Sequence, residues 1–227
     1  MLTQAKVFFR EIIAKNHIKN TRKCQHLSAF DVNPFLNIYL ANFLTGDGSP
    51  ESIAKALVYP RVLGTSITTS FGTNFQQFCN NTLSGFASMI SGIDIEFIDQ
   101  IDGRKKYCQI KSGPNTINSG DVDTILNHFT SAKNIARTNG LRVDIDDFIV
   151  GVFYGNSDDL SQHYRRIQQH YPVITGQEFW HRLTGDSQFF FYLIDAIGEV
   201  ANEANSVVLL EDVIATLADE IYENGFS

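Results

Sequence analysis

Two short stretches near the middle of the chain carry polar side chains at alternate positions. They cover residues 93–101 and 106–112, and Asp102-Gly103 lies between them. A period of two predicts β-strands, and Asp-Gly is a strong signal for a two-residue hairpin turn. Alternation then places four polar side chains on one face of the hairpin: Asp94, Glu96, Gln109 and Lys111.

The predicted hairpin register brings these four side chains together. If Asp102-Gly103 is the whole turn, counting from it sets Glu96 opposite Gln109 and Asp94 opposite Lys111. Opposed side chains have Cβ atoms about 4.5–5.5 Å apart, so the polar tips can converge. Two carboxylates, an amide oxygen and an ammonium group form a cluster that suits Mg²⁺ and phosphodiester hydrolysis. The alternative is a solvent-exposed hairpin face with Glu–Lys cross-strand pairs.

The elements around the hairpin indicate an α/β fold. Helical periodicity predicts helices over residues 3–19, 35–44, 50–58, 73–90, 121–138, 161–170, 177–183, 189–204 and 209–224, with a Gly/Thr/Ser-rich turn at 64–72. Further strands are predicted at 148–154 and 172–175. We therefore expect a small mixed central β-sheet flanked by helices, with helical N-terminal and C-terminal layers. We expect residues 1–60 to form a helical subdomain for DNA contact or dimerisation, and residues 61–227 a core that includes the C-terminal helices.

Charge is distributed unevenly along the chain. The net charge is −7, yet every Lys and Arg lies at or before Arg182, and nine of the 25 acidic residues follow it. Residues 1–185 thus carry 18 basic and 16 acidic side chains, and residues 1–30 hold six bases and one acid. Such basic patches can meet phosphates, although a solvated surface without a partner is an equal alternative.

Other functional classes find little support in the sequence. We expect no membrane segment, because no apolar run reaches the 18–20 or so residues that a spanning helix needs. Three distant cysteines fit a reducing cytoplasm and give neither a disulfide framework nor zinc-ligand spacing. No phosphate-binding glycine motif occurs, so we expect no nucleotide cofactor. The six histidines show no metal-ligand spacing and are interpreted as surface or core residues.

The hairpin resembles the core of PD-(D/E)XK nucleases, in which an acidic residue starts one strand and (D/E)XK lies on the next. Three blocks, at residues 63–73, 109–118 and 175–186, also resemble PmeII-like type II restriction endonucleases. The resemblance covers about residues 61–200. It implies a prokaryotic, cytoplasmic enzyme that hydrolyses double-stranded DNA at a specific sequence with Mg²⁺. It also implies a homodimer, because a two-fold target mirrors a two-fold protein.

The resemblance assigns roles to individual residues. Asp94 matches the motif aspartate and Lys111 the motif lysine. Ile110, the residue between Gln109 and Lys111, would add a metal ligand. Gln109 stands where the family usually has Glu or Asp. Since an amide brings no charge, we expect Glu96 to compensate and Gln109→Glu to keep or improve metal affinity.

The surroundings of the motif offer candidates for DNA contact. The loop after the second strand provides hydrogen-bonding groups, and two lysines precede the motif: Ser112, Asn115, Thr116 and Asn118, with Lys105 and Lys106. Asn118 could instead cap the next helix.

Two other functions remain open. The first is a DNA-binding module whose catalysis is weakened or lost because of Gln109. The second is a structure-selective or repair nuclease.

Overall fold

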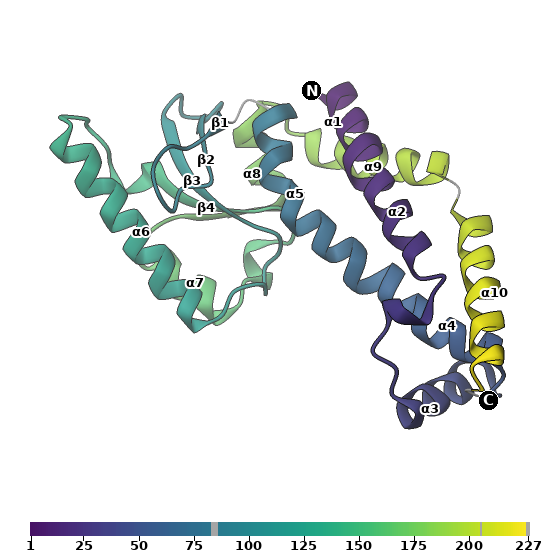
Figure 1. Ribbon diagram of the computed structural model, residues 1–227. Helices are drawn as coiled ribbons and strands as arrows, with labels where there is room; N and C mark the ends of the chain where they lie inside the picture. Colours follow the sequence, from purple (N-terminus) through teal and green to yellow (C-terminus); the bar gives the residue numbers. More distant parts are fainter. Residues whose placement is uncertain (83–85, 205, 226–227) are drawn as a thin grey trace. The chain divides into compact units, whose positions relative to one another are not determined.

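The computed structural model describes residues 1–82, 86–204 and 206–225, without the side chains at 75, 76, 80–82 and 86. The chain divides into two compact units (Figure 1). The sheet unit comprises Met1–Lys6 and Asn74–Ile197, and the helical unit comprises Val7–Thr73 and Gly198–Ser227. Among the helices described, none has the length and apolarity to cross a membrane.

The sheet unit is built on a five-stranded mixed sheet with the strands in sequence order. Its strands are β1 (Phe86–Ala87), β2 (Ile95–Ile98), β3 (Lys105–Lys111), β4 (Phe148–Val152) and β5 (Val173–Thr175). β1, β2 and β3 pair antiparallel, whereas β3, β4 and β5 pair parallel. The predicted α/β class and mixed sheet are confirmed.

Helices cover both faces of this sheet. On one face, α6 (Ser119–Thr138) and α7 (Gln162–Gln168) pack against side chains of β3 and β4. These are Tyr107 of β3 and Phe148, Val150 and Val152 of β4. Tyr107 stacks on Phe148 there, and Phe129 of α6 packs on the same ring. On the other face, α8 (Gly176–Thr184) sets Phe179 edge-on against Phe97 of β2. Both faces of β4 are thus buried, as its continuous apolar run predicts.

The turn between β2 and β3 is wider than the predicted two-residue hairpin. Asp99 N–H donates to the Arg104 carbonyl at 2.9 Å, so four residues lie between the last paired positions. Arg182 of α8 bonds the Asp99 carboxylate at 2.8 Å and, through its carbonyl, the Gln100 N–H at 2.8 Å. Because these long-range contacts hold the turn open, the register differs by two residues from the predicted one.

The helical unit is a bundle with its own core. It contains α2 (Lys15–Lys23), α3 (Pro34–Thr45), α4 (Pro50–Pro60) and α10 (Val207–Glu223), with a π-helical turn at Phe9–Ala14. The helix α4 packs against both α3 and α10, and Ala41, Ala54 and Leu217 of this core are fully buried. Asn33 and Ser49 cap α3 and α4, each followed by proline at the first helical position. These starts agree with the sequence prediction.

Two predictions about the chain outside the sheet differ from the structure. The Gly/Thr/Ser-rich stretch at 64–72 is helical, within a π-helical segment (Arg61–Ser66) and α5 (Ile67–Thr82). Thr68 and Thr73 each bond the carbonyl four residues back, which satisfies their hydroxyls inside a helix. Residues 198–227 belong to the helical unit and not to the core predicted for 61–227, because α10 buries its apolar face against α4. The chain passes between the units within α1 (Leu2–Phe8), α5 and α9 (Phe189–Ala204).

Candidate active site

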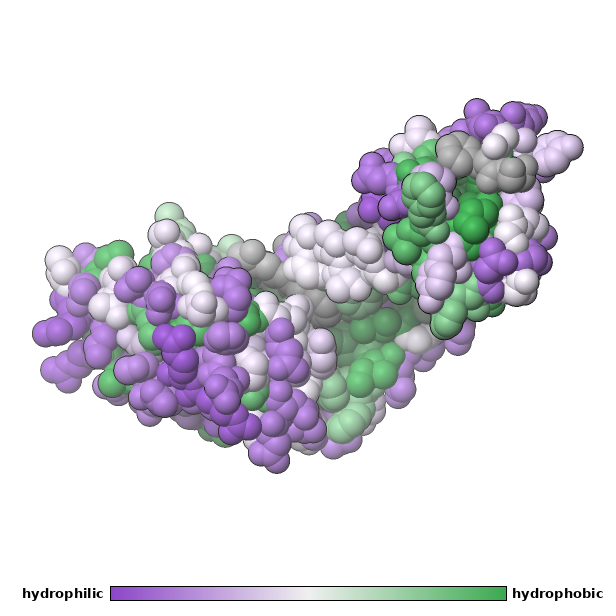
Figure 2. Space-filling view, turned by 90° about the horizontal axis from the view of Figure 1, so that it is seen from below, coloured by the Kyte–Doolittle hydropathy of each residue, from purple (hydrophilic) through white to green (hydrophobic). Residues whose placement is uncertain are grey.

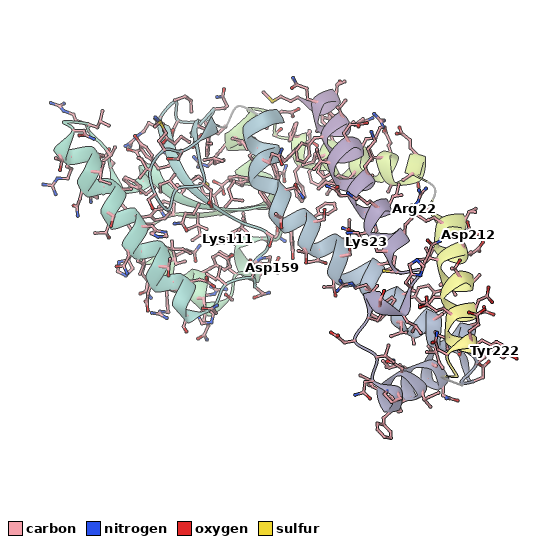
Figure 3. All side chains as sticks on the ribbon, viewed as in Figure 1. Arg22, Lys23, Lys111, Asp159, Asp212 and Tyr222 are labelled. Carbon is pink, nitrogen blue, oxygen red and sulfur yellow. The ribbon has the colours of Figure 1, made fainter. Side chains whose placement is uncertain are left out.

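Of the polar side chains singled out in the sequence, Glu96, Gln109 and Lys111 lie on one face of β2 and β3. The observed pairs are Ile95 with Cys108 and Glu96 with Tyr107. Asp94 lies just before β2, and its N–H donates to the Cys108 carbonyl at 3.0 Å. A shift of two residues preserves the face, because side chains alternate with period two. Lys111 ends β3 two residues after Gln109 and therefore lies on the same face as Gln109. Figure 3 labels Lys111. This face also packs against α6, so it is half-buried and not the open surface of a hairpin.

Asp94 is anchored to the strand that carries the rest of the motif. One carboxylate oxygen accepts a hydrogen bond from the Ile110 N–H at 2.7 Å. Burial raises the pKa of Asp94, whereas this hydrogen bond and the nearby Lys111 and His128 lower it. The Asp94 carboxylate is therefore held at a fixed point beside Lys111. Because it is partly removed from water, its charged form is less stable there than in solution. A bound cation would offset that cost.

Gln109 is 5% exposed, and its amide is oriented by two acceptors. Its Nε2 donates to the Gly92 carbonyl and lies 3.0 Å from His128 Nδ1 on α6. A carbonyl oxygen only accepts, so the amide nitrogen of Gln109 must face Gly92. The amide oxygen is then the group available to a ligand.

The close approach of α6 to the strand depends on Gly92. Its φ is +81°, and a Cβ at this position would lie 2.2 Å from His128 Cγ. Only glycine both adopts this conformation freely and leaves room for the ring. The sequence analysis gave His128 no role. Nothing in its spacing could have revealed one, because α6 brings it to Gln109 from 19 residues away.

Glu96 does not lie opposite Gln109, so that prediction is wrong. It is 7% exposed and pairs with Lys105 at 2.5 Å, and one of its oxygens accepts from Ser88 Oγ at 2.6 Å. The wider turn moves Glu96 next to Tyr107. Its proposed role as a metal ligand stays a prediction, but the position that motivated it is not the observed one.

A comparison with protein families decides between the functions left open by the sequence. The family model described as type II restriction endonuclease EcoO109I matches residues 3–205. The chain belongs to this family of type II restriction endonucleases. It is therefore a site-specific deoxyribonuclease with DNA as its substrate. No curated protein matches the chain.

The donors of this restriction endonuclease fit a magnesium ion that keeps part of its water shell. Among the residues described, no three His, Cys, Asp or Glu side chains are close enough to hold a metal. Mg²⁺ needs only one or two protein carboxylates, because waters and substrate phosphates complete its octahedron. The buried Asp94 carboxylate and the Gln109 amide oxygen, with the backbone of Ile110 between them, provide such a partial set.

The loop that follows β3 in the endonuclease is held mainly by its own contacts. Thr116 Oγ1 donates to the Gly113 carbonyl at 2.9 Å and lies 3.2 Å from the Tyr164 hydroxyl. Asn118 caps α6 by accepting from the Gly120 and Asp121 N–H groups. Asn115 is exposed and Ser112 half-buried. Their predicted contact with DNA stays a prediction, with Asn115 the most accessible of them.

The two lysines before the motif have different environments. Lys106 is 2% exposed, and its Nζ lies 2.6 Å from an Asp102 oxygen and 3.1 Å from the Asp146 carbonyl. This side chain cannot reach DNA, and its predicted contact is wrong. It lies on the opposite face of β3 from the site, where its partners neutralise a buried charge. Lys105 remains partly exposed beside Glu96.

Proposed function

We propose that the endonuclease hydrolyses double-stranded DNA with Mg²⁺ held by Asp94, the Gln109 amide oxygen and the Ile110 carbonyl, in the manner of PD-(D/E)XK nucleases. The observation that carries this proposal is the hydrogen bond from the Ile110 N–H to the Asp94 carboxylate, which holds that carboxylate against the strand that bears Gln109 and Lys111. When bound, the metal would polarise the scissile phosphate and acidify a water.

The side chains around the metal have separate proposed roles. Lys111 orients the attacking water by donating a hydrogen bond to it, since its ammonium lies near Asp94. Asp94 supplies negative charge at a fixed place, and His128 holds the Gln109 amide with its oxygen free. Ser112, Asn115, Thr116, Asn118 and Lys105 are the proposed DNA contacts around the motif. The family suggests a prokaryotic, cytoplasmic setting, and the likeness to PmeII-like enzymes stays a prediction.

Incubation of the purified chain with long DNA of mixed sequence tests the proposed function. We expect discrete fragments with Mg²⁺ and no cleavage in excess chelator, because the reaction needs the metal and a specific sequence. A smear would indicate a nuclease without sequence specificity. Binding without any cleavage would favour the module whose catalysis Gln109 has weakened. Full cleavage in chelator would contradict the metal proposal.

We also propose that the active species is a homodimer that associates through α3. Its sequence is almost entirely apolar, and three aromatic side chains form a stripe at four-residue spacing. Phe35 is 88%, Tyr39 63% and Phe43 78% exposed, and hydrophobic side chains lie open on the helical unit (Figure 2). Aromatic side chains bury about 150–250 Å² each, so this stripe is comparable to the largest apolar patch of a typical monomer, and such a patch is often an interaction site. A second copy suits a two-fold DNA target.

Sedimentation tests this dimer. We expect the wild type to sediment at about twice 25.5 kDa and a Phe35→Glu/Phe43→Glu variant at the mass of one chain. Both side chains are largely exposed, so the variant should fold normally. Leu141→Glu is the control, because Leu141 is also 54% exposed but lies in the sheet unit. A monomeric wild type on and off DNA would contradict the proposal.

A further inference from the structure

The helical unit carries a basic face on α2 that the proposed active site does not use. Four cations and a histidine recur at spacings of four, three, one and three residues, which is one side of a helix: Lys15, Lys19, Arg22, Lys23 and His26. The opposite side is anchored, since Thr21 and Cys24 are buried and His17 Nε2 lies 2.9 Å from the Val62 carbonyl. The helix therefore presents its charged side outward. Figure 3 labels Arg22 and Lys23 on it.

These residues line a hollow in the surface. With Ile18 they surround a volume of about 600 Å³. The hollow has a cationic rim and one apolar side chain, and among its lining residues none is acidic. Such a surface fits an anion of extended shape better than a small polar ligand, which would need several convergent donors and acceptors.

The charge of the basic face is only partly neutralised within the protein. Lys15 pairs with Glu11, and His26 lies 3.3 Å from Glu220. Lys23 bonds only the neutral Asn20 amide oxygen, at 3.1 Å. For Lys19 and Arg22, no ion pair is found within the described part of the chain. By contrast, two other cations of the helical unit are paired: Arg10 with Glu203 at 2.6 Å and Lys55 with Glu51 at 2.5 Å.

Only part of this concentration of charge stabilises the helix. Like charges three and four residues apart destabilise a helix by about 0.2–0.5 kcal/mol per pair. The helix dipole favours Arg22 and Lys23 in the last turn, but Lys19 lies before that turn. The helical unit as a whole holds seven Lys and Arg against eleven Asp and Glu, so the face is a segregated positive patch on an acidic unit. Segregation of this kind is typical of an anion-binding surface.

We infer that the basic face of α2 binds the phosphate backbone of the DNA substrate, outside the catalytic strands. The inference rests on DNA being the substrate. The nine residues of α2 span about 13 Å, which corresponds to roughly four phosphates along one strand. Arg22 can hold a phosphate with two parallel hydrogen bonds, and Lys19 and Lys23 act as flexible point charges. Contacts of this kind to phosphates contribute affinity without sequence preference.

Salt dependence of DNA binding tests this inference. Binding of a fluorescent duplex is measured between 50 and 200 mM KCl without Mg²⁺, in the Asp94→Asn background so that no cleavage occurs. The slope of log K against log salt is about −0.9 per phosphate contact. We expect Lys19→Gln/Arg22→Gln to make the slope shallower by about 1.8 and to weaken binding at least tenfold at the lowest salt.

The control variant removes the same amount of charge from the same unit. Arg10→Gln/Lys55→Gln takes away two cations that are already paired with carboxylates, and we expect the slope to stay unchanged. Equal changes in both variants, or a change in neither, would overturn the inference while leaving the proposed function intact. Tighter binding of polyglutamate than of the duplex, lost in Lys19→Gln/Arg22→Gln, would assign the face to an acidic protein and also overturn it. Absence of DNA binding by the parent protein would contradict the proposed function itself.

Discussion

Asp94→Asn is expected to lower the cleavage rate by at least about a thousandfold while leaving DNA binding in place. The asparagine oxygen can still accept the Ile110 N–H bond, so the strand geometry is kept. What is lost is the charge that holds the metal, and a bound metal contributes several kcal/mol to the transition state, which is on the order of a thousandfold. The rate is measured at saturating DNA and Mg²⁺.

The same substitution should not destabilise the fold. Burial raises the pKa of Asp94, so the charged carboxylate is less stable in the folded chain than in water. A neutral side chain of the same shape removes that cost, and we expect an unchanged or higher Tm. A lower Tm together with lost cleavage would show that Asp94 acts through the fold and not through the metal.

Glu96→Gln is the matched variant on the same strand face. Its contacts with Lys105 and Ser88 lead us to expect a smaller loss of activity than for Asp94→Asn. An equal loss would establish Glu96 as a second metal carboxylate despite the observed register. Comparing the activities of Asp94→Asn and Glu96→Gln therefore distinguishes a metal ligand from a residue that only stabilises the strand.

Lys111→Met is expected to lower the cleavage rate by about a hundredfold to ten-thousandfold, the range typical of a positioned acid–base group. Methionine keeps most of the side-chain length and removes the ammonium that orients the water. Because Lys111 is not itself a proposed metal ligand, Mg²⁺ should still bind to the variant. The rate at saturating DNA shows the defect, and titration with Mg²⁺ shows whether metal binding is retained.

Lys105→Met is the control for this prediction, since Lys105 lies on the same strand but pairs with Glu96. We expect less than a tenfold change in rate at saturating DNA, with any effect on DNA affinity appearing below saturation. A Lys111→Met variant with full activity would remove Lys111 from the proposed mechanism. A large loss in both variants would point to the general charge of β3 and not to one lysine.

The expected effect of Gln109→Glu on metal affinity changes once the surroundings of Gln109 are known. The resemblance led us to expect that glutamate would keep or improve metal affinity. In the structure, the Gln109 nitrogen faces the Gly92 carbonyl, where a carboxylate would set one acceptor against another. The glutamine is thus matched to its own surroundings, with His128 and Gly92 as parts of that match.

Local patterns in the sequence determined the elements and the faces of the strands. The hairpin strands were predicted to within three residues at either end, and Glu96, Gln109 and Lys111 share a face as expected. Period-two alternation is a property of each strand, so the face survives any even shift of register. The buried strand β4 and the capped starts of α3 and α4 were predictable for the same reason, because their signals lie within a few residues.

Tertiary structure alone decided which of these residues meet. Arg182 holds the β2–β3 turn open from 83 residues away and thereby sets Glu96 opposite Tyr107 and not opposite Gln109. His128 orients the Gln109 amide from another helix, and α10 joins α4 from the far end of the chain. Pairing and side-chain orientation depend on contacts between distant segments, and such contacts leave no periodic signal in the sequence.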